Sequence, residues 1–534
     1  MIPTIQILVL LLIVIAAVAV MAARLKIPPA ILLVLTGVIL ALVPGLPTVN
    51  LAPEFVLLIV LPPIIYSSAV AMSWHEFKFN LRPISLLAVG CVLFTTIAAA
   101  AVTHWLLGFS WPVGFVLGAI VSPPDAVAPL SIARRMQLPR RLVVILEGEG
   151  LANDASALIL YRFAVAAVSL SAFSFNHAAG MFAAIIGGEI LWGIGVGWLM
   201  LRLRRWVQDP RIEIMLSILT PFLAYWPPEH LGGSGVLATV TAGLYISWNG
   251  LKLISAATRL QGIFFWDFLI YLTEGFVFLI TGLQARTLIA GIHGDSLSDL
   301  GLSAGVVCAV VIMARFVWMF PATYLPRWLI PSVARADPSP PWQWPFALAF
   351  TGVRGTVSLA AALAIPLTTE SGALFPERDR ILFLTFSVIL VTLVGQGLML
   401  PAVIRALGLA NAGRRERHAD RVEEFAARRQ AIEAAMQRLD EIATERKLTE
   451  DFVRPLRTRH RDRLEAVEHR SDGDEGHKRL IELHDEIEFT LIESERQQIN
   501  ELYRGGKLKD EARRRIEREL DLREAQLTNV RAEE

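Results

Sequence analysis

Long apolar segments follow one another over most of the chain, and short polar or charged turns separate them. An α-helix needs about 20 apolar residues to cross the hydrocarbon core of a bilayer, and these segments are close to that length. Dividing the chain at charges, prolines and polar turns predicts thirteen spans, at about residues 2–23, 27–43, 52–72, 84–108, 112–132, 142–171, 178–201, 211–227, 232–248, 263–285, 301–325, 345–368 and 379–404. The pattern predicts an all-α polytopic membrane protein.

The pattern changes after residue 404, where apolar residues thin out and charge dominates. Phe425, Ile432, Met436 and Leu439 recur at helical spacing in this tail, which predicts amphipathic helices. We therefore predict two domains, a transmembrane domain over residues 1–404 and a charged cytoplasmic helical domain over residues 405–534. The tail is either a solvated helical appendage or a regulatory domain that responds to pH or to a ligand, and its sequence identifies no ligand.

Basic residues are unevenly divided between alternate turns. Sixteen lie on one predicted side of the membrane, and three, Arg286, Arg378 and Arg380, lie on the other. Because cytoplasmic loops are enriched in Lys and Arg, we expect the N-terminus outside and the tail in the cytoplasm, in a bacterial inner membrane. The net charge of +1 argues against a nucleic-acid partner.

The chain also contains a weak internal repeat. The fifth span is interrupted by SPPDAVAP (residues 122–129) and the twelfth by TGVRGTVS (residues 351–358), so each contains helix breakers and one charge. The two spans are seven apart and therefore run in opposite directions. Such a pair is typical of inverted-repeat transporters, whose site lies at the midplane between two broken helices.

Three carboxylates lie in the sixth span, within EGEGLANDASA (residues 147–157). A charged side chain at mid-membrane costs at least about 2.5 to 3.5 kcal/mol, so such residues usually mark an ion or proton site. Asp154 can hold a proton or a monovalent cation, and competition between the two is sufficient for exchange. Asn153 adds an uncharged oxygen beside it. The alternative is an Asp hydrogen-bonded within a buried polar network.

Asp125 follows two prolines, which break the helix and leave carbonyl groups without intrahelical partners. Unwound backbone at membrane depth is tolerated where it lines a cavity or finds polar partners. We expect Asp125 to neutralise and fix the crossing of the two broken helices, with Ser122 near the ion. A helix-capping role at the kink is compatible with this interpretation.

Arg354 is the only cation in its apolar span and requires a buried anion. Glu149 precedes Asp154 by five residues, so their side chains point about 140° apart on a helix and cannot both face one small site. We therefore predict a structural ion pair between Glu149 and Arg354, with Glu147 as the alternative partner.

The remaining intramembrane charges are predicted to snorkel or to pair between helices; they are Glu274, Arg315, Arg162, Glu189 and Asp267. The His residues have no metal-binding spacing, so we predict no cofactor and no metal other than the transported ion. No phosphate-binding loop or nucleophile motif occurs, so we expect neither an enzyme nor an ATP-driven pump.

Four ordered motifs, LPPIIYSSA (residues 61–69), SPPDAVAP, EGEGLANDASAL (residues 147–158) and TGVRGTVSLA (residues 351–360), resemble the monovalent cation/proton antiporter family one. This family contains bacterial and animal sodium/proton exchangers, and the resemblance covers about residues 5–405. It implies thirteen spans, with a core of spans four to six and eleven to thirteen that moves like an elevator against a dimerisation domain.

The resemblance also assigns roles. It implies that Asn153 and Asp154 bind the ion, that Asp125 belongs to the site, that Glu149 and Arg354 form the core ion pair, and that exchange is electroneutral. The sequence departs from the family at Gly150, where Ser is common, and at Tyr66, Ser67 and Ser68, where some archaeal members have an acidic residue. These departures leave the ranking of Na+, K+ and Li+ open.

We therefore expect a homodimeric Na+/H+ antiporter in which Asp154 is alternately protonated and cation-bound. The alternatives are a K+/H+ antiporter of the same fold, a transport-dead membrane sensor that signals through the tail, and a channel.

Overall fold

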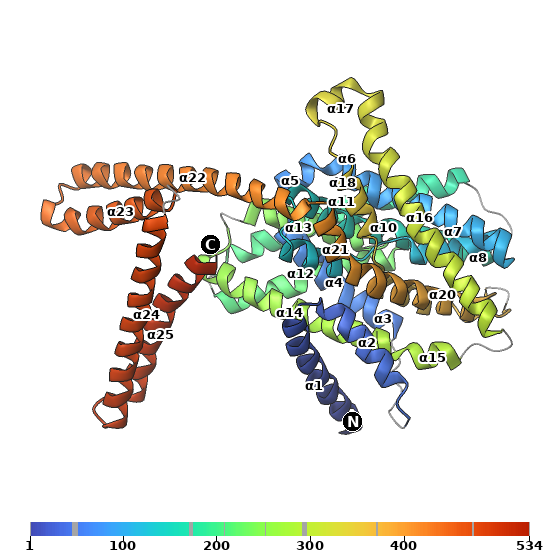
Figure 1. The fold of residues 1–534 in the computed structure, drawn as a ribbon, viewed down its shortest axis with the longest axis horizontal. Helices are drawn as coiled ribbons and strands as arrows, with labels where there is room; N and C mark the ends of the chain where they lie inside the picture. The colour runs from blue at the N-terminus through green and yellow to red at the C-terminus, as the bar shows by residue number, and fades with distance from the viewer. Residues whose placement is uncertain are drawn as a thin grey trace. The chain divides into compact units, whose positions relative to one another are not determined.

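The computed structural model describes residues 2–44, 52–169, 175–207, 209–250, 253–290, 296–369, 372–471 and 475–532 (Figure 1). Within these ranges the chain is helical, and the one β-type contact is an isolated bridge between Thr368 and Leu374. The chain divides into two compact units, Met1–Arg414 and Arg415–Glu534. The second unit begins ten residues after the boundary expected from the change in composition.

The helices of the first unit are α1 (Ile2–Leu25), α2 (Pro29–Ala41), α3 (Pro53–Phe55), α4 (Leu61–Ala71), α5 (Trp74–Phe79), α6 (Leu81–Ser85), α7 (Val92–Leu107), α8 (Trp111–Val121), α9 (Val127–Arg135), α10 (Arg140–Ser169), α11 (Phe175–Arg204), α12 (Pro210–His230), α13 (Val236–Gly250), α14 (Ala256–Leu283), α15 (Ala285–Ala290), α16 (Leu297–Leu329), α17 (Pro331–Ala336), α18 (Gln343–Phe350), α19 (Thr356–Leu363), α20 (Arg378–Leu390) and α21 (Gly397–Ala406). α22 (Leu409–Glu445) begins in this unit and continues into the second.

Three π-helical turns lie inside apolar helices of the first unit: η1 (Val56–Val60), η2 (Leu86–Cys91) and η3 (Val391–Gln396). A π-helical turn widens the backbone locally and frees it for other contacts, and such turns are frequent near functional sites. One of them, η3, supplies a hydrogen-bond acceptor to the second broken helix, as described below.

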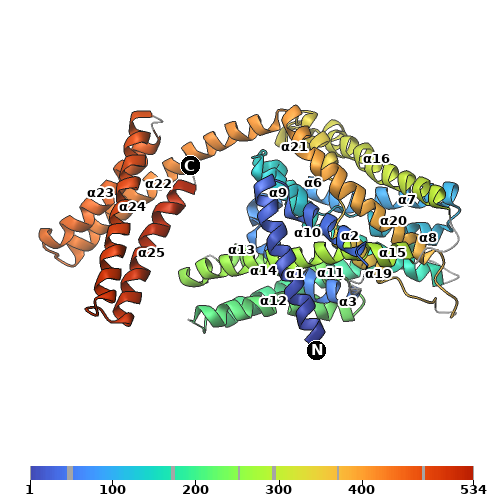
Figure 2. The ribbon, with the colours of Figure 1, turned by 60° about the horizontal axis from the view of Figure 1, so that its bottom comes forward.

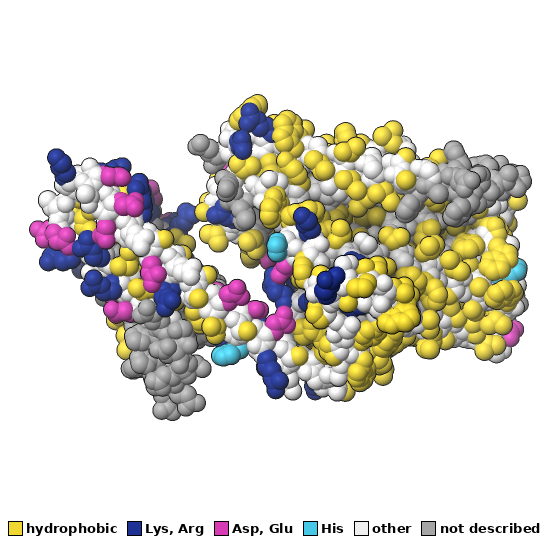
Figure 3. All heavy atoms as spheres, turned by 90° about the horizontal axis from the view of Figure 1, so that it is seen from above, with side chains coloured by type: hydrophobic (Ala, Val, Ile, Leu, Met, Phe, Trp, Pro, Cys, Tyr) yellow, Lys and Arg dark blue, Asp and Glu magenta, His cyan; other side chains and the backbone are white. Residues whose placement is uncertain are grey.

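In the described part of the chain, eight stretches are long and apolar enough to cross a membrane: Gln6–Leu25, Pro53–Ala71, Leu81–Leu107, Arg140–Val168, Ala183–Arg204, Ala256–Ile289, Ser298–Leu329 and Arg378–Ala406. The five other predicted spans fall on α2, on α8 and α9, on α12, on α13, and on α18 and α19; of these, α2 and α8 are shorter apolar helices. Hydrophobic side chains are spread widely over the face of the first unit that Figure 3 shows. The all-helical, polytopic prediction is confirmed, whereas the count of thirteen crossings stays a prediction.

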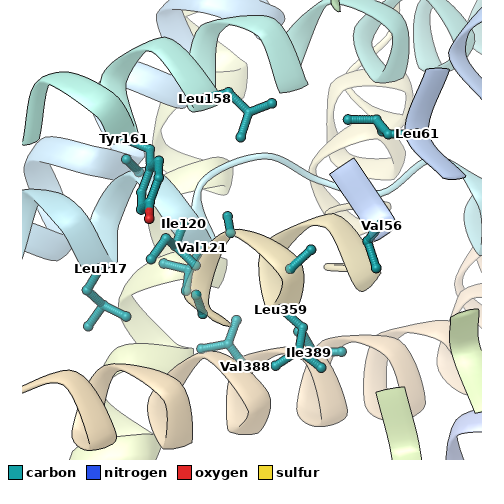
Figure 4. Close-up of a cluster of buried hydrophobic side chains, with 14 of the residues drawn as sticks. Val56, Leu61, Leu117, Ile120, Val121, Leu158, Tyr161, Leu359, Val388 and Ile389 are labelled. Atoms are coloured by element: carbon teal, nitrogen blue, oxygen red, sulfur yellow. The ribbon is translucent and has the colours of Figure 1, made fainter. Parts of the chain in front are cut away.

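The first unit holds several buried apolar clusters. The largest joins the helices around the two breaks, and Figure 4 shows Leu117 and Ile120 of α8, Leu158 of α10, Leu359 of α19 and Val388 of α20 converging in it. A separate cluster joins α4, α11, α12 and α13 through Tyr66, Val196, Ala224 and Ala242. The largest cluster also includes Ile65 of α4, Tyr225 of α12 and Val240 of α13, so the two clusters share helices.

α2 and α14 cross in backbone contact. A Cβ on Gly37 would lie 2.3 Å from the carbonyl oxygen of Leu279, and a Cβ on Gly282 would lie 2.2 Å from that of Val34. Small residues allow such close approach between helices in a membrane, where van der Waals packing rather than the hydrophobic effect drives association. The two glycines therefore fix the position of α14 beside the breaks.

The second unit continues α22 and adds α23 (Glu450–Ser471), α24 (Glu475–Arg504) and α25 (Asp510–Ala532). α24 and α25 lie side by side in Figures 1 and 2, and Ile492, Ile499 and Leu520 form a buried seam between them. Arg496 of α24 adds ion pairs to Asp521 and Glu524 of α25. The unit is thus a small helical assembly held by a thin apolar core and surface charge.

A cluster of three arginines on one carboxylate joins distant parts of the first unit. Asp337 accepts hydrogen bonds from Arg82, from Arg141 over 2.8 Å and from Arg327 over 2.7 Å, so it ties α6, α10 and α16 together. Burial alone would raise the pKa of Asp337, but hydrogen bonds and charges from these arginines hold that pKa below its ordinary value. The sequence offered no signal for this cluster, because its members are up to 255 residues apart.

We predict that Asp337→Asn lowers the free energy of unfolding at pH 7 by about 2 kcal/mol, since three charged donors lose their acceptor. The folded-state pKa lies below the unfolded one, so the carboxylate stabilises the fold at neutral pH and loses this effect as the pH falls through the folded-state value. Thermal melts of the two proteins should therefore converge in acid. Asp379→Asn, at a 65% exposed side chain, is the control and should change little. Equal melting curves at pH 7 for wild type and Asp337→Asn would contradict the prediction.

Candidate functional site

The first broken helix carries Asp125. α8 ends at Val121, α9 begins at Val127, and the irregular segment SPPDA connects them. Pro123 and Pro124 have no N–H group, so the helix cannot continue through them. The backbone N–H of Val127 donates to Oδ1 of Asp125 over 2.9 Å, and Asp125 thereby binds the N-terminus of α9.

The second helix is broken between Phe350, at the end of α18, and Thr356, at the start of α19. This break contacts the first one at Asp125. The backbone N–H of Asp125 donates to the carbonyl of Val353 over 2.7 Å. A Cβ on Gly355, which directly precedes α19, would lie 1.6 Å from Oδ2 of Asp125. The carboxylate therefore faces the N-terminal ends of α9 and α19, where the helix dipoles favour negative charge.

Arg354 is buried and binds backbone carbonyls. Its Nε donates to the carbonyl of Val121 over 2.9 Å, its Nη2 to that of Ser122 over 3.3 Å, and its Nη1 to that of Gly352. Its backbone N–H donates to Oγ1 of Thr392 in η3 over 3.0 Å. A guanidinium at this position satisfies the carbonyls freed at the C-terminal end of α8 and opposes the negative end of its dipole.

The predicted pairing of Glu149 with Arg354 is wrong, because Glu149 pairs with Arg315 of α16. The two side chains are 2% and 1% exposed, and Nη2 of Arg315 lies 2.8 Å from Oε2 of Glu149 in a two-point contact. Arg315 also donates to the carbonyl of Leu348 through Nε and Nη2, over 3.1 and 3.0 Å. Helical spacing predicted that Glu149 and Asp154 point in different directions. It could not predict which of the two buried arginines pairs with Glu149.

α8 and α18 both end at a break, and the carbonyl groups at their C-terminal ends find hydrogen-bond donors in the same way. Ser122 Oγ donates to the carbonyl of Ala119, three residues earlier, and Thr351 Oγ1 donates to that of Leu348, also three residues earlier. An arginine binds the carbonyl end of each half-helix. This correspondence agrees with the internal repeat in the sequence. It also turns the hydroxyl of Ser122 toward its own helix, whereas we expected it near the ion.

Asp154 of α10 lines a small cavity beside the crossing. Pro123, Tyr161 and Ser358 also line this cavity, within which the centre of a water molecule could occupy about 10 Å³. That is room for about one water molecule or an ion of similar size. No described residue donates a hydrogen bond to the carboxylate of Asp154 or pairs with it. The charges of Asp154 and Asp125 are close enough to repel each other.

Asn153 is fully buried and only half satisfied. Its Nδ2 donates to the carbonyl of Pro124 over 2.7 Å, which joins α10 to the first break. Its Oδ1 has no hydrogen-bond partner among the described residues. A buried acceptor without a donor is costly, and a cation or an ordered water would relieve that cost.

Glu274 of α14 approaches the same region from outside the broken helices. Phe278, one helical turn later, belongs to a buried cluster that includes Ala128 of α9 and Val353 of the second break. Glu274 is half-buried, has no hydrogen-bond or ion-pair partner among the described residues, and lies close enough to Asp125 for their charges to repel. We had expected it to snorkel or to find a partner on another helix.

The other predicted charges have structural partners. Glu147 pairs with Arg134 of α9 over 2.7 Å, so it is not the partner of the buried arginine in the second break. Arg162 pairs with Glu229 of α12, as expected for a link between helices.

Glu189 binds the backbone at the start of α13. Its Oε1 accepts from the N–H groups of Ser234 and Gly235 over 2.6 and 3.2 Å, and its Oε2 accepts from that of Leu237 over 3.1 Å. It therefore caps a helix, which the sequence pattern did not indicate. Asp267, in contrast, is exposed on α14.

Two departures from the family pattern have geometric consequences. A Cβ on Gly150 would lie 2.7 Å from the Cβ of Ala126, so α10 approaches the first break too closely for Ser at this position without a shift. Tyr66 is buried against Trp266 and accepts a hydrogen bond from Arg204 over 3.4 Å, so its hydroxyl serves packing between α4, α11 and α14. Among the described residues, no group of three or more His, Cys, Asp and Glu could hold a metal ion.

The pairing can be tested by double-mutant cycles on protein unfolding. Arg315→Met alone should cost about 3 to 5 kcal/mol, because the buried charge of Glu149 loses its partner, and adding Glu149→Gln should recover much of that loss. The coupling of Glu149 with Arg354 should be much weaker, since Arg354 binds carbonyl groups. A larger coupling for the Arg354 cycle than for the Arg315 cycle would contradict the observed pairing.

Comparison with known proteins agrees with this geometry. The family described as sodium/hydrogen exchanger, transmembrane, matches residues 8–406. An uncharacterised Na+/H+ exchanger of Mycobacterium tuberculosis is 35% identical over 515 residues, covering 94% of this chain and 92% of that protein. A sodium, potassium, lithium and rubidium/H+ antiporter of Bacillus subtilis is 33% identical over 70% of this chain and 57% of its own length.

The fold is similar to that of the sodium proton antiporter MjNhaP1 from Methanocaldococcus jannaschii, solved at pH 8. The TM-score is 0.60 at 20% identity, and the match covers 76% of this chain and 98% of that one. The family match extends over both broken helices and over all the residues of the crossing. The chain is therefore a multi-pass membrane protein of the sodium/hydrogen exchanger family.

Proposed function

We propose that this chain exchanges one Na+ for one H+ across the membrane, with Asp154 as the group that carries each in turn. The observation that supports this most is that two adjacent residues of α10 each keep a side-chain oxygen without a partner among the described residues. Asp154 has no donor among the described residues and lines a cavity of one-water size, and Asn153 Oδ1 beside it is buried without a partner. Both atoms are suitable ligands for a hard monovalent cation, which prefers oxygen.

The charges of the site favour electroneutral exchange. The carboxylate of Asp125 accepts a hydrogen bond at the N-terminus of α9 and lies against Gly355 before α19, and Glu149 is neutralised by Arg315. Asp154 is then the one carboxylate lining the cavity that can change its occupant. A single carboxylate that releases one proton when it takes one monovalent cation moves no net charge in a complete cycle.

Alternating access requires the ion site to face each side of the membrane in turn. We propose that the helices around the breaks, α6 to α10 and α16 to α21, move as a core domain against the remaining helices in an elevator-like motion. The remaining helices would also form a homodimer in the bilayer. The N-terminus would lie outside and the second unit in the cytoplasm of a bacterial inner membrane, as the distribution of basic residues predicts.

Fewer observations bear on which cation is exchanged. Close packing of Gly150 against Ala126 excludes the additional hydroxyl that is common in the family, so the cation would have fewer protein oxygens. The related B. subtilis protein is named for several cations, which makes K+ and Li+ the competitors to test. We place Na+ first because the family is described by sodium exchange.

The test is proton flux in proteoliposomes with an imposed pH gradient, with Na+, K+ or Li+ added in turn. Wild type should dissipate the gradient on addition of Na+, and Asp154→Asn should reduce the rate to the level of empty liposomes, because an amide cannot release a proton to the cation. Asp267→Asn is the matched control: the same substitution on an exposed carboxylate of α14 should leave exchange intact. Clamping the membrane potential should not change the Na+-driven rate if exchange is electroneutral.

Each alternative gives a different result. A stronger response to K+ than to Na+ would make the chain a K+/H+ antiporter. Cation flux that persists in Asp154→Asn without proton coupling would indicate a channel. No response of folded wild-type protein to any cation would contradict transport and favour a sensor that acts through the second unit.

A further inference from the structure

A second polar cavity lies in the first unit, away from Asp154. It is formed where α9 ends, α21 ends and α22 begins, and its volume is about 360 Å³. Its lining includes Arg135 and Gln137 after α9, Arg405 of α21, and Asn411 and Arg414 in the first turns of α22. All of these lie on the side of the membrane that the basic residues mark as cytoplasmic.

Three arginines from three helices meet at this cavity without an acidic partner. No Asp or Glu lines it. Arg405 donates through Nε to the carbonyl of Pro401 on its own helix, and Arg414 donates to the side chain of Asn411. Arg135 is exposed and has no hydrogen bond or ion pair with any described residue.

Other arginines near the predicted cytoplasmic ends of these helices form ion pairs with carboxylates. Arg134 pairs with Glu147, Arg140 with Glu76, and Arg141 with Asp337. Carboxylates are therefore used in this region to neutralise arginines that hold helices together. At the second cavity three arginines are gathered, and none of them forms an ion pair with a described carboxylate.

The backbone at the cavity is also suited to an anion. α22 starts at Leu409, directly after Gly408, which has a φ of +69° and lines the cavity. The N-terminus of this long helix therefore opens beside the arginines, and helix N-termini favour negative charge. Guanidinium groups bind phosphate in two-point geometry, so three of them with a helix N-terminus are typical of phosphate recognition.

We propose that this cavity binds a phosphate-bearing anion, through Arg135, Arg405, Arg414 and the start of α22. The volume is sufficient for a phosphodiester with its glycerol, or for a small free phosphate compound, and is within the usual range for ligand sites. Basic pockets between helices on the cytoplasmic side bind anionic lipid headgroups, so a lipid and a soluble phosphate are the two sources. The proposal does not depend on transport.

An anion bound in this second cavity would lie between the ends of three helices and could hold them together. α9 begins two residues after Asp125, and its other end lines the cavity. The chain after α9 touches α22 at backbone level, since a Cβ on Gly413 would lie 1.9 Å from the carbonyl oxygen of Gln137. An anion bridging the three arginines would join α9, α21 and α22 and so fix the half-helix whose N-terminus binds Asp125.

The experiment measures the melting temperature of purified full-length protein in detergent while one of three probes is titrated. The probes are short-chain phosphatidylglycerol, short-chain phosphatidylcholine and inorganic pyrophosphate. The test variant is Arg135→Gln/Arg405→Gln/Arg414→Gln. Arg335→Gln is the matched control, because Arg335 is exposed on α17 and donates through Nε to the carbonyl of Pro331, four residues earlier, as Arg405 does with Pro401.

We expect phosphatidylglycerol or pyrophosphate to raise the melting temperature of wild type and of the control. Each arginine removed should weaken the apparent affinity about fivefold, so the triple variant should lose about two orders of magnitude. A response to phosphatidylglycerol alone identifies a lipid headgroup, and an equal response to pyrophosphate identifies free phosphate chemistry.

The proposal is overturned if neither anionic probe stabilises wild type, if the triple variant responds as wild type does, or if phosphatidylcholine is as effective as phosphatidylglycerol. If the triple variant does not fold, Arg135→Gln carries the same test with a fivefold expectation. Arg135 has no hydrogen bond or ion pair with any described residue, so this single change removes no such bond within the described part of the chain.

Discussion

Two helices are broken in the middle of a membrane domain, and every carbonyl and N–H group freed by the breaks requires a partner, because the surrounding lipid offers none. Arg354 and Arg315 bind the carbonyl ends of α8 and α18. Asp125 accepts a hydrogen bond at the N-terminal end of α9 and lies against Gly355, which precedes α19. These three side chains are buried for structural reasons. Replacing any one would leave an unsatisfied backbone end or an unpaired charge where desolvation costs are greatest.

Once those requirements are met, Asp154 remains available as the carboxylate that lines the small cavity. Asp154 has no donor among the described residues, and Asn153 uses its amide nitrogen to bind the first break while its oxygen stays free. The fold and the proposed chemistry are connected in this way. The carboxylates of Asp125 and Glu149 hold the broken helices in place, whereas that of Asp154 can bind a proton or a cation in turn. When it is ionised, Glu274, on a helix outside the breaks, adds negative potential that attracts cations toward this region.

The sequence alone predicted the helical class, both breaks and their meeting at Asp125, because prolines, glycines and isolated charges in apolar spans have few structural explanations. It also turned Glu149 away from Asp154 by helical spacing. It could not choose between Arg315 and Arg354 as partners of Glu149, since that choice depends on where α16 packs. The Asp337 cluster was missed for the same reason: contacts between residues far apart in the chain leave no local pattern.

The central claim is that a proton and a cation compete for Asp154, and the most direct test is cation binding to purified protein at several pH values. The account predicts that adding NaCl releases about one proton per protein and that the Kd for Na+ rises about tenfold for each unit of pH below the pKa of the site. Asp154→Asn should abolish both effects. Tight Na+ binding that is independent of pH, with no proton released, would contradict the account.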